Sequence, residues 1–185
     1  MEASIARRRM SVEEYIAFEE RADIRHEFIN GQLIAMAGTK DRHNIICGNC
    51  LIAFRMALKG KAGTVFMENV KVQITDNRDY TYPDIFITTD DSDTDSPYIK
   101  RHPILILEVL SDSTRTYDKT EKFTKRYQKI ESLHYYMTVE PEKTVVEFHV
   151  KDEKKKWATR VFTEFDEQIA LPLLDISVSL YDLYV

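Results

Sequence analysis

The chain has little cysteine, glycine or proline, and it has no long hydrophobic run. Two cysteines are too few for a disulfide framework or a four-thiolate zinc site. Five glycines and five prolines in 185 residues exclude collagen-like and linker-dominated chains. The apolar run at residues 104–107 is far too short to span a bilayer, and no apolar stretch follows the arginines at residues 7–9, so no secretory signal is visible. We therefore expect a soluble, cytoplasmic protein without a membrane partner.

Positive charge is not in excess either, since the formal net charge is −5 at pH 7. This balance excludes a globally basic nucleic-acid coat but leaves room for a local basic patch. A protein of this charge that handles polyanions needs a metal ion or a concentrated ridge of lysine and arginine to offset the repulsion. The chain is 43% hydrophobic, which is enough to bury a sizeable core. Its length fits a single domain over residues 1–185, with residues 1–10 as a flexible N-terminal arm.

Local sequence patterns predict three helices and a series of strands. Ser11 and Glu14 have the spacing of a capping box, which predicts a first helix over residues 12–20. Asp41 is a candidate cap for a second helix, over residues 41–58. The other expected elements are a third helix over residues 117–130 and strands over residues 70–74, 80–89, 104–110, 133–139, 144–150 and 157–163. The tail, residues 169–185, is expected as a short strand or extended segment closed by at most one helical turn at residues 180–184. This order predicts a mixed α/β domain.

The Asn30-Gly31 pair is the strongest turn pattern in the chain. It lies between two apolar-rich runs, and both positions of a two-residue hairpin turn favour positive φ. Such a turn places Glu27 opposite Ile34 on the neighbouring strand.

Cys47 and Cys50 lie inside the second predicted helix, in a Cys-Gly-Asn-Cys sequence. They share a helix face with Phe54 and Leu58. A thioredoxin-like motif follows a strand instead, so we interpret the two thiols as core residues rather than as a redox centre.

Two carboxylates interrupt strongly apolar segments. Glu108 lies within the apolar run at residues 104–110, and Asp84 opens the run at residues 85–87. Burying an unpaired carboxylate costs several kcal/mol, so such a group persists where a cation or hydrogen-bond donors compensate it. On neighbouring strands the two groups repel each other unless a cation lies between them, and Mg²⁺ or Mn²⁺ prefers such oxygen ligands. The alternative is two separate strand-end residues, each solvated or in a salt bridge.

Pro83-Asp84 followed by Glu108-Val109-Leu110 resembles the signature of PD-(D/E)XK nucleases, whose acidic pair lies on adjacent strands. More closely, the chain resembles the Uma-two-type restriction endonuclease family over nearly its whole length. The order and spacing of short motifs carry this resemblance, at residues 11–15, 25–31, 43–44, 82–84, 107–111, 113–114, 118, 121–122 and 127. It implies a restriction-endonuclease-like mixed β-sheet flanked by helices, and Mg²⁺-dependent hydrolysis of phosphodiester bonds.

By this resemblance, Asp84 and Glu108 hold the metal ion, with the Val109 carbonyl as a further ligand. The lysine that usually stands two residues after the glutamate is absent, because that position is Leu110. The family's pattern implies that Lys122, on the following helix, supplies the ammonium group instead. From the residues alone, Lys122 fits equally well into a solvated basic ridge of that helix.

Two further residues are candidates for the site. Glu27 resembles the additional acidic residue of the superfamily, which supports the metal site or binds a second ion. Its alternative role is a strand carboxylate paired with lysine or arginine. His43, near the start of the second predicted helix, is a candidate for phosphate contact or general acid catalysis, and its alternative role is structural.

The resemblance implies DNA as the substrate. Cutting both strands of a duplex usually requires two active centres, so a homodimer is expected. A second hypothesis is a nuclease-fold module that has lost activity and binds nucleic acid or protein, and its best support is Leu110. A third is a metal-dependent phosphoesterase that acts on small phosphate esters.

Overall fold

A computed structural model of the chain describes residues 9–36, 38–75, 78–112 and 115–185. Most of the predicted N-terminal arm, and the motif residues 113–114, lie outside the described residues. The elements are α1 (Val12–Glu19), β1 (His26–Ile29), β2 (Gln32–Ala35), α2 (Asp41–Ala57), β3 (Thr64–Met67), β4 (Lys71–Thr75), β5 (Asp79–Thr81), β6 (Ile85–Thr88), η1 (Asp91–Thr94), β7 (Ile99–Lys100), β8 (Pro103–Val109), α3 (Arg115–Tyr117), η2 (Asp118–Lys122), α4 (Phe123–Lys125), η3 (Tyr127–Lys129), β9 (Tyr135–Val139), β10 (Val146–Lys151), β11 (Trp157–Phe162), β12 (Gln168–Leu171), η4 (Pro172–Leu174), β13 (Ile176–Ser179) and α5 (Leu180–Tyr184).

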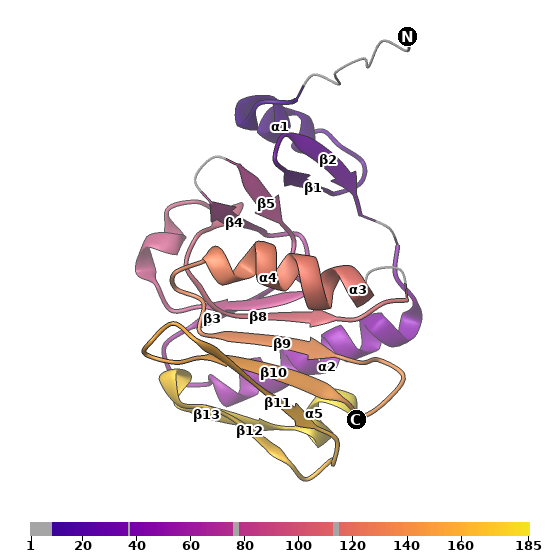
Figure 1. Ribbon diagram of the computed structural model, residues 1–185, viewed down its shortest axis with the longest axis vertical. Coiled ribbons are helices and arrows are strands. Elements are labelled where there is room, and N and C mark those ends of the chain that lie inside the picture. Colours follow the sequence, from indigo (N-terminus) through magenta and orange to yellow (C-terminus); the bar gives the residue numbers. More distant parts are fainter. Residues whose placement is uncertain (1–8, 37, 76–77, 113–114) are drawn as a thin grey trace.

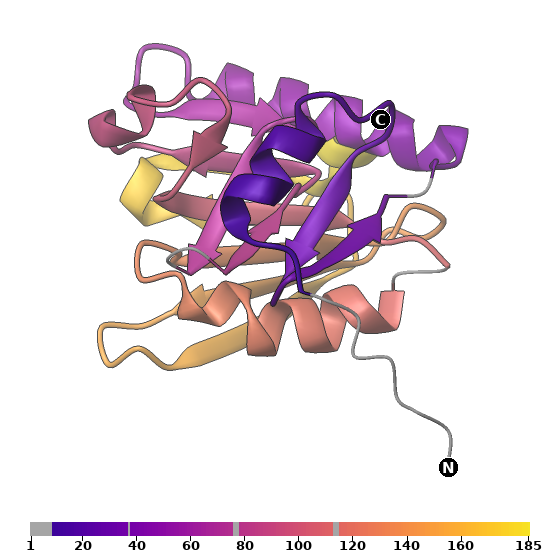
Figure 2. The ribbon, with the colours of Figure 1, turned by 90° about the horizontal axis from the view of Figure 1, so that it is seen from above.

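Six strands form a mixed sheet in the order β11-β10-β9-β8-β6-β3. β8 and β9 run parallel, and the other neighbours in this sheet run antiparallel. α2 covers one face of the sheet, and the helical segment from α3 to η3 covers the other (Figures 1 and 2). A second sheet, in the order β2-β1-β5-β4-β7, lies at the end of the molecule that carries α1 (Figure 1). The predicted mixed sheet flanked by helices is confirmed.

The side chains of β8 alternate between two hydrophobic cores. Leu105 and Leu107 pack into the core that α2 covers, whereas Ile106 packs with Tyr127 on the opposite face. Successive side chains of a strand point to opposite faces of the sheet, so Glu108 lies on the same face as Ile106. The Glu108 carboxylate therefore lies beneath the helical segment that contains Tyr127.

The first hairpin and the first helix are confirmed. Asn30 and Gly31 have positive φ angles of 49° and 82°, and Glu27 pairs with Ile34 across the turn. Ser11 caps α1 in a capping box, as its spacing with the glutamate three residues later predicts. The segment before α1 also contacts this turn, because the Met10 N–H donates a 3.1 Å hydrogen bond to the Gly31 carbonyl.

The single strand predicted over residues 80–89 is wrong. The chain forms two strands there, β5 and β6, which belong to different sheets. The break falls at residues 82–84, where Pro83 has no N–H to donate to a strand partner. Asp84 therefore lies immediately before β6, where the chain passes from one sheet to the other.

The helix predicted over residues 117–130 is broken into short turns. α3 leads into a π-helical turn, η2, and α4 ends at Arg126, whose φ and ψ of −125° and −70° are not helical. The apolar face was predicted correctly, because Phe123, Tyr127 and Ile130 all lie in one core. π-helical turns often occur at functional sites, and Lys122 ends this one.

Two further expectations on the helices and strands need correction. α2 begins where predicted, but its N-cap residue is Lys40, and the Asp41 carboxylate accepts a hydrogen bond from the Arg42 N–H. On β4, Lys71 and Gln73 alternate with apolar residues, a pattern typical of a half-exposed strand, yet both are buried. The ring of Tyr82 and the side chain of Arg101 provide their contacts, so both faces of this strand are covered.

The C-terminal tail is more ordered than an extended segment. β12 and β13 form an antiparallel hairpin, and α5 confirms the predicted final helical turn. Cys47 and Cys50 are both buried free thiols in the core under α2, as predicted. None of the helices among the described residues has the length and apolar character needed to cross a membrane.

Candidate active site

Asp84 and Glu108 lie next to each other at one edge of the six-stranded sheet, Asp84 immediately before β6 and Glu108 on the antiparallel neighbour β8. Ile85 of β6 pairs with Leu107 of β8, so the two acidic residues continue the same register. Each carboxylate accepts a backbone hydrogen bond from the other strand. The Val109 N–H donates to Asp84 Oδ2 over 2.7 Å, and the Asp84 N–H lies 3.4 Å from Glu108 Oε2. Backbone N–H groups thus hold the carboxyl groups of Asp84 and Glu108 close together.

Glu108 is buried, with 4% of its side chain exposed. Its Oε1 is 2.8 Å from the Lys122 ammonium nitrogen and accepts a 2.6 Å hydrogen bond from the Tyr127 hydroxyl. Burial raises the pKa of Glu108 to about 8, against the opposing charge of Lys122, and the nearby charge of Asp84 adds to the rise. The carboxylate therefore needs further positive charge to remain ionised at neutral pH.

Lys122 is a buried cation among carboxylates, and not part of a solvated ridge. Its ammonium nitrogen lies 2.8 Å from Glu108, 3.0 Å from Glu27 and 3.7 Å from Asp118. Burial favours the neutral amine, but the carboxylates outweigh it and raise the pKa of Lys122 well above its usual value. Lys122 is therefore charged at neutral pH.

Glu27 reaches the same cluster from the other sheet. The β1–β2 hairpin carries it, and its side chain is buried against Lys122 with 8% exposed. Glu27 is paired with a lysine, as one of the two expectations predicts, and the same lysine contacts Glu108. A role of Glu27 at a metal site stays a prediction.

His43 lies on α2 and contacts Asp84. Its Nε2 lies 3.4 Å from Asp84 Oδ1, and its Nδ1 is buried without a hydrogen-bond partner among the described residues. Burial opposes protonation, but Asp84 outweighs it and raises the pKa of the His43 imidazole. Cys47, one turn further along α2, is close enough that ligand atoms of the three side chains all lie within 4.8 Å of one another.

The structure thus brings Asp84, Glu108, Lys122 and Glu27 into one cluster and places His43 at its edge. Val109 follows directly on β8 and contributes its N–H to Asp84, while the ligand role of its carbonyl stays a prediction.

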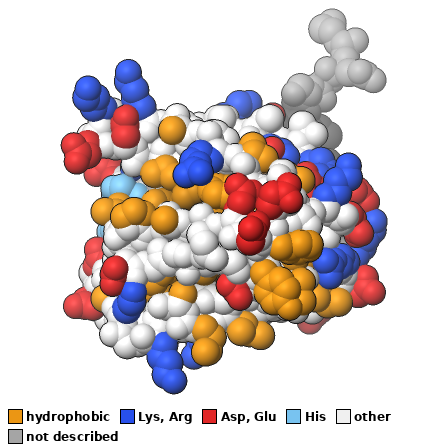
Figure 3. All heavy atoms as spheres, turned by 90° about the horizontal axis from the view of Figure 1, so that it is seen from below, with side chains coloured by type: hydrophobic (Ala, Val, Ile, Leu, Met, Phe, Trp, Pro, Cys, Tyr) orange, Lys and Arg blue, Asp and Glu red, His pale blue; other side chains and the backbone are white. Residues whose placement is uncertain are grey.

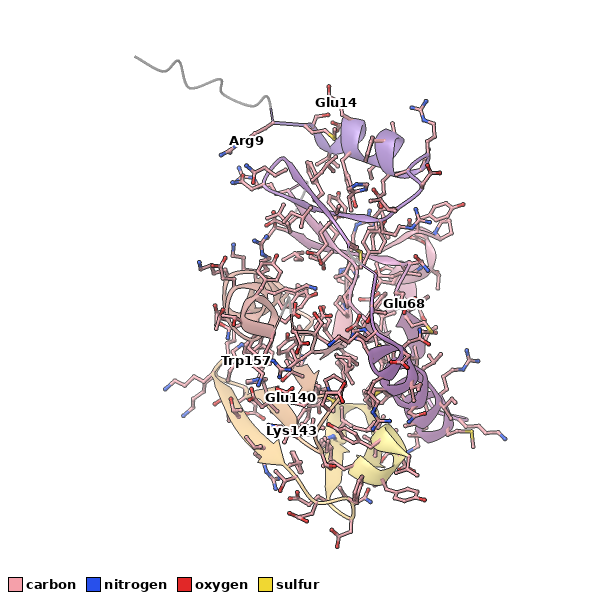
Figure 4. The ribbon with its side chains drawn as sticks, turned by 90° about the vertical axis from the view of Figure 1, so that its right-hand side faces the viewer. Arg9, Glu14, Glu68, Glu140, Lys143 and Trp157 are labelled. Atoms are coloured by element: carbon pink, nitrogen blue, oxygen red, sulfur yellow. The ribbon has the colours of Figure 1, made fainter. Side chains whose placement is uncertain are left out.

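Two acidic residues at this edge were not predicted from the sequence. Glu140 follows β9 and lies between the α3–α4 segment and α2 (Figure 4), where it forms ion pairs with Arg115 and Lys119. Glu68 follows β3, and its N–H donates to the Asp84 carbonyl over 3.0 Å. Each directly follows a strand that ends at the same edge as β8, a position that only the sheet order reveals.

A mixed sheet that carries an acidic pair on adjacent strands, with a lysine bound to one of them, has the architecture of the PD-(D/E)XK nuclease class. Residues 12–181 match the Uma2 family, described as "Putative restriction endonuclease". The chain belongs to this family. The match covers α1 to α5 and so includes every residue of the cluster.

Two relatives come from Synechocystis sp., and neither name states an activity. "Uncharacterized protein slr1290" is 32% identical over 149 residues, which are 80% of this chain and 78% of the relative. "Uncharacterized protein sll1609" is 29% identical over 150 residues, 80% of this chain and 84% of the relative. Among solved structures, a "putative nuclease belonging to DUF820" from Anabaena variabilis shares the fold with a TM-score of 0.73. It is 18% identical, and the similarity covers 95% of this chain and 97% of that one.

Proposed function

We propose that this chain is a metal-dependent endonuclease that hydrolyses phosphodiester bonds of DNA. The observation that carries the proposal is the close approach of Asp84, immediately before β6, to Glu108 on β8, with Lys122 bound to Glu108. Family membership and the nuclease-like fold support the same reaction class. In this proposal the chain acts as one nuclease-like domain.

The donor atoms at this place suit Mg²⁺ or Mn²⁺. Lys122 and Tyr127 occupy Glu108 Oε1, whereas Oε2 has only a long 3.4 Å contact with a backbone N–H. Asp84 Oδ2 is held by the backbone, which leaves Oδ1 toward His43. Oxygen ligands of two adjacent carboxylates are those that hard divalent cations prefer. Asp84 and Glu108 would hold the ion, with the Val109 carbonyl as a further ligand.

When bound, such an ion lowers the pKa of a water ligand and offsets the charge that develops on the phosphate. Lys122 is already protonated, so we assign it electrostatic stabilisation and positioning of the phosphate or water rather than proton abstraction. Glu27 holds Lys122, and Tyr127 fixes one oxygen of Glu108. His43 positions Asp84 and is a candidate proton donor to the leaving group.

The hypothesis of an inactive module drew its support from Leu110, which stands where the signature has lysine. Lys122 supplies an ammonium group beside Glu108 from a different element, so Leu110 alone gives little reason to expect loss of activity. We therefore keep the endonuclease as the proposal, with the inactive module as the outcome if no cleavage is seen.

A DNA backbone would have to meet local positive charge on an acidic protein. On the face seen in Figure 3, lysine and arginine side chains are scattered among acidic and hydrophobic ones, with no continuous basic stripe. Lys119, a candidate for backbone contact, is engaged by Glu140 and Glu147. Lys125 and Lys129 are exposed on the helical segment above the cluster and are better placed to contact phosphates. We further propose a homodimer, because cutting both strands calls for two centres.

The test is cleavage of supercoiled plasmid by purified protein in Mg²⁺ or Mn²⁺, beside Asp84→Asn and Glu108→Gln. Asp95→Asn is the matched control, because Asp95 is an exposed carboxylate in the segment between η1 and β7. Cleavage by the wild type and the control, with loss in both site variants and in chelator, supports the proposal. Equal cleavage by all four proteins reveals a contaminant and contradicts it, as does turnover of small phosphate esters without cleavage of DNA.

A further inference from the structure

We propose that His43, Cys47 and Asp84 form a binding site for Zn²⁺ that shares only Asp84 with the oxygen-ligand site of the acidic pair. Their ligand atoms all lie within 4.8 Å of one another. His43 and Cys47 are four residues apart on α2, so their side chains emerge from the same helix face one turn apart. Asp84 completes the group from the start of β6.

The distances approach those of a tetrahedral zinc centre. Zinc–ligand distances of about 2.0–2.3 Å imply ligand atoms about 3.3–3.6 Å apart. His43 Nε2 and Asp84 Oδ1 are 3.4 Å apart, which lies within that range. No separation in the group exceeds 4.8 Å, so the Cys47 thiol lies at most about 1.2 Å beyond that range. Three protein ligands leave a fourth position for water, as in zinc sites that stay open.

The imidazole of His43 gives independent support. Its side chain is 11% exposed, and its Nδ1 makes no hydrogen bond with the described residues. Its Nε2 contact with Asp84, at 3.4 Å, is long for a hydrogen bond. Buried polar groups in native proteins nearly always have partners, so a histidine with no good hydrogen bond on either nitrogen points to a ligand.

The donor set selects the metal. A thiolate and an imidazole suit Zn²⁺, whereas Mg²⁺ is bound by oxygen and disfavours sulfur. Glu108, on the other side of Asp84, belongs to the oxygen-ligand group. The two sites share Asp84, and because the Val109 N–H occupies Oδ2, both ions would compete for Oδ1. We therefore expect Zn²⁺ binding to inhibit Mg²⁺-dependent cleavage. This consequence, unlike the zinc site itself, rests on the proposed nuclease function.

Binding is tested with the purified full chain and two probes, Zn²⁺ by calorimetry and Co²⁺ by absorption, both in excess Mg²⁺. A thiolate bound to Co²⁺ gives a charge-transfer band that oxygen and nitrogen ligands alone do not. Cys50→Ala is the matched control for Cys47→Ala, because both thiols are fully buried in the same core on the same helix. Glu108→Gln tests whether the ion instead uses the acidic pair.

We expect one Zn²⁺ per chain and a charge-transfer band in the wild type, Cys50→Ala and Glu108→Gln. Cys47→Ala should lose the band and bind Zn²⁺ about a hundredfold more weakly or worse. Removal of a residue that only hydrogen-bonds to a metal ligand already lowers metal affinity by about 10- to 100-fold, and removal of the ligand itself should cost at least as much. Cys47→Ser, which also lacks the band, replaces Cys47→Ala if thermal melting shows that the alanine variant is unfolded. The absence of the band in the wild type, or its persistence without Cys47, overturns the proposal. So does Zn²⁺ binding that Glu108→Gln abolishes and Cys47→Ala does not.

The functional consequence is measured separately, as inhibition of plasmid cleavage by Zn²⁺ at fixed Mg²⁺. Each variant is compared with its own rate without Zn²⁺. Inhibition of the wild type and Cys50→Ala, with loss of inhibition in Cys47→Ala, supports the shared use of Asp84. If no protein cleaves DNA while the charge-transfer band depends on Cys47, the nuclease proposal fails and the zinc site stands.

Discussion

The ammonium nitrogen of Lys122 lies 2.8 Å from Oε1 of Glu108, although 14 positions separate the two residues along the chain. The Tyr127 hydroxyl donates to the same oxygen, so Oε1 is fully engaged and Oε2 is directed to the Asp84 side. Glu108 is therefore anchored at one oxygen and available at the other. This division fits a metal ligand whose position is set before the metal arrives.

Removal of the Lys122 charge should harm both stability and activity. In Lys122→Met, the carboxylates of Glu27 and Glu108 lose their common partner inside the protein, which costs about 3–5 kcal/mol of unfolding free energy. DNA cleavage should fall by about a hundredfold or more, because an electrostatic group at the phosphate is lost. Denaturant unfolding and plasmid cleavage measure the two effects.

Lys125→Met is the control for the effect of this change on stability. Lys125 is a neighbouring lysine whose side chain is 67% exposed and paired only with Glu121. Its loss should change the unfolding free energy by about 0.5 kcal/mol or less. Equal effects of the two substitutions on the unfolding free energy would show that Lys122 is an ordinary surface residue.

Tyr127→Phe should reduce activity more than its effect on stability explains. The substitution keeps the ring in the core and removes one hydrogen bond to Glu108, at a cost of about 1–3 kcal/mol of unfolding free energy. Without that anchor, Glu108 loses its fixed position, so cleavage should require higher Mg²⁺ concentrations. The Mg²⁺ concentration at half-maximal cleavage is the measurement.

Tyr135→Phe is the comparison for Tyr127→Phe. Tyr135 is also buried, but its hydroxyl accepts a hydrogen bond from the Leu173 N–H, on the other face of the sheet. It should lose similar stability while keeping the wild-type Mg²⁺ dependence. A shifted Mg²⁺ requirement in both variants would mean that general loosening, and not the position of Glu108, is responsible.

The acidic pair was predictable from the sequence because both members violate a local rule. Asp84 and Glu108 interrupt apolar segments that otherwise read as buried strands, and the antiparallel pairing of β6 with β8 brings them together. Glu27 was predictable for a related reason, because Asn30-Gly31 sets the hairpin register and hence the face on which its side chain lies.

Lys122 and Glu140 could not be placed from local patterns. Lysines and arginines recur along the helical segment, so the sequence does not distinguish the buried Lys122 from its exposed neighbours such as Lys125. The π-helical turn and the packing of Glu27 against it make that distinction. Glu140 reaches the site edge through the parallel pairing of β8 with β9, a long-range contact that local periodicity does not encode.

Mg²⁺ or Mn²⁺ should stabilise the folded protein, and the acidic pair should be required for it. A ligand that binds only the folded state adds about 2.7 kcal/mol when its concentration is a hundred times its Kd. Thermal melting with and without the metal measures this shift. In Asp84→Asn and Glu108→Gln the shift should disappear, whereas Asp95→Asn should keep it. A shift of equal size in all four proteins would place the ion elsewhere.

His149 should make the protein less stable in mild acid. Burial lowers the pKa of this imidazole below its usual 6.5, and the charge of Lys119 adds to the effect against that of Glu147. The ring packs 4.6 Å from the Phe123 ring, and its Nδ1 lies 2.8 Å from the Thr159 hydroxyl. Between its folded and unfolded pKa values, the unfolded chain binds more protons at this residue.

The contribution of His149 to stability is therefore complete above pH 6.5 and declines as the pH falls below that value. Urea unfolding at a series of pH values between 5 and 8, at about constant ionic strength, measures the slope. His149→Gln cannot titrate, so its unfolding free energy should fall less steeply with acid than that of the wild type. Because other groups titrate in both proteins, the difference between the two slopes is the quantity that isolates this imidazole, and identical slopes would contradict the prediction.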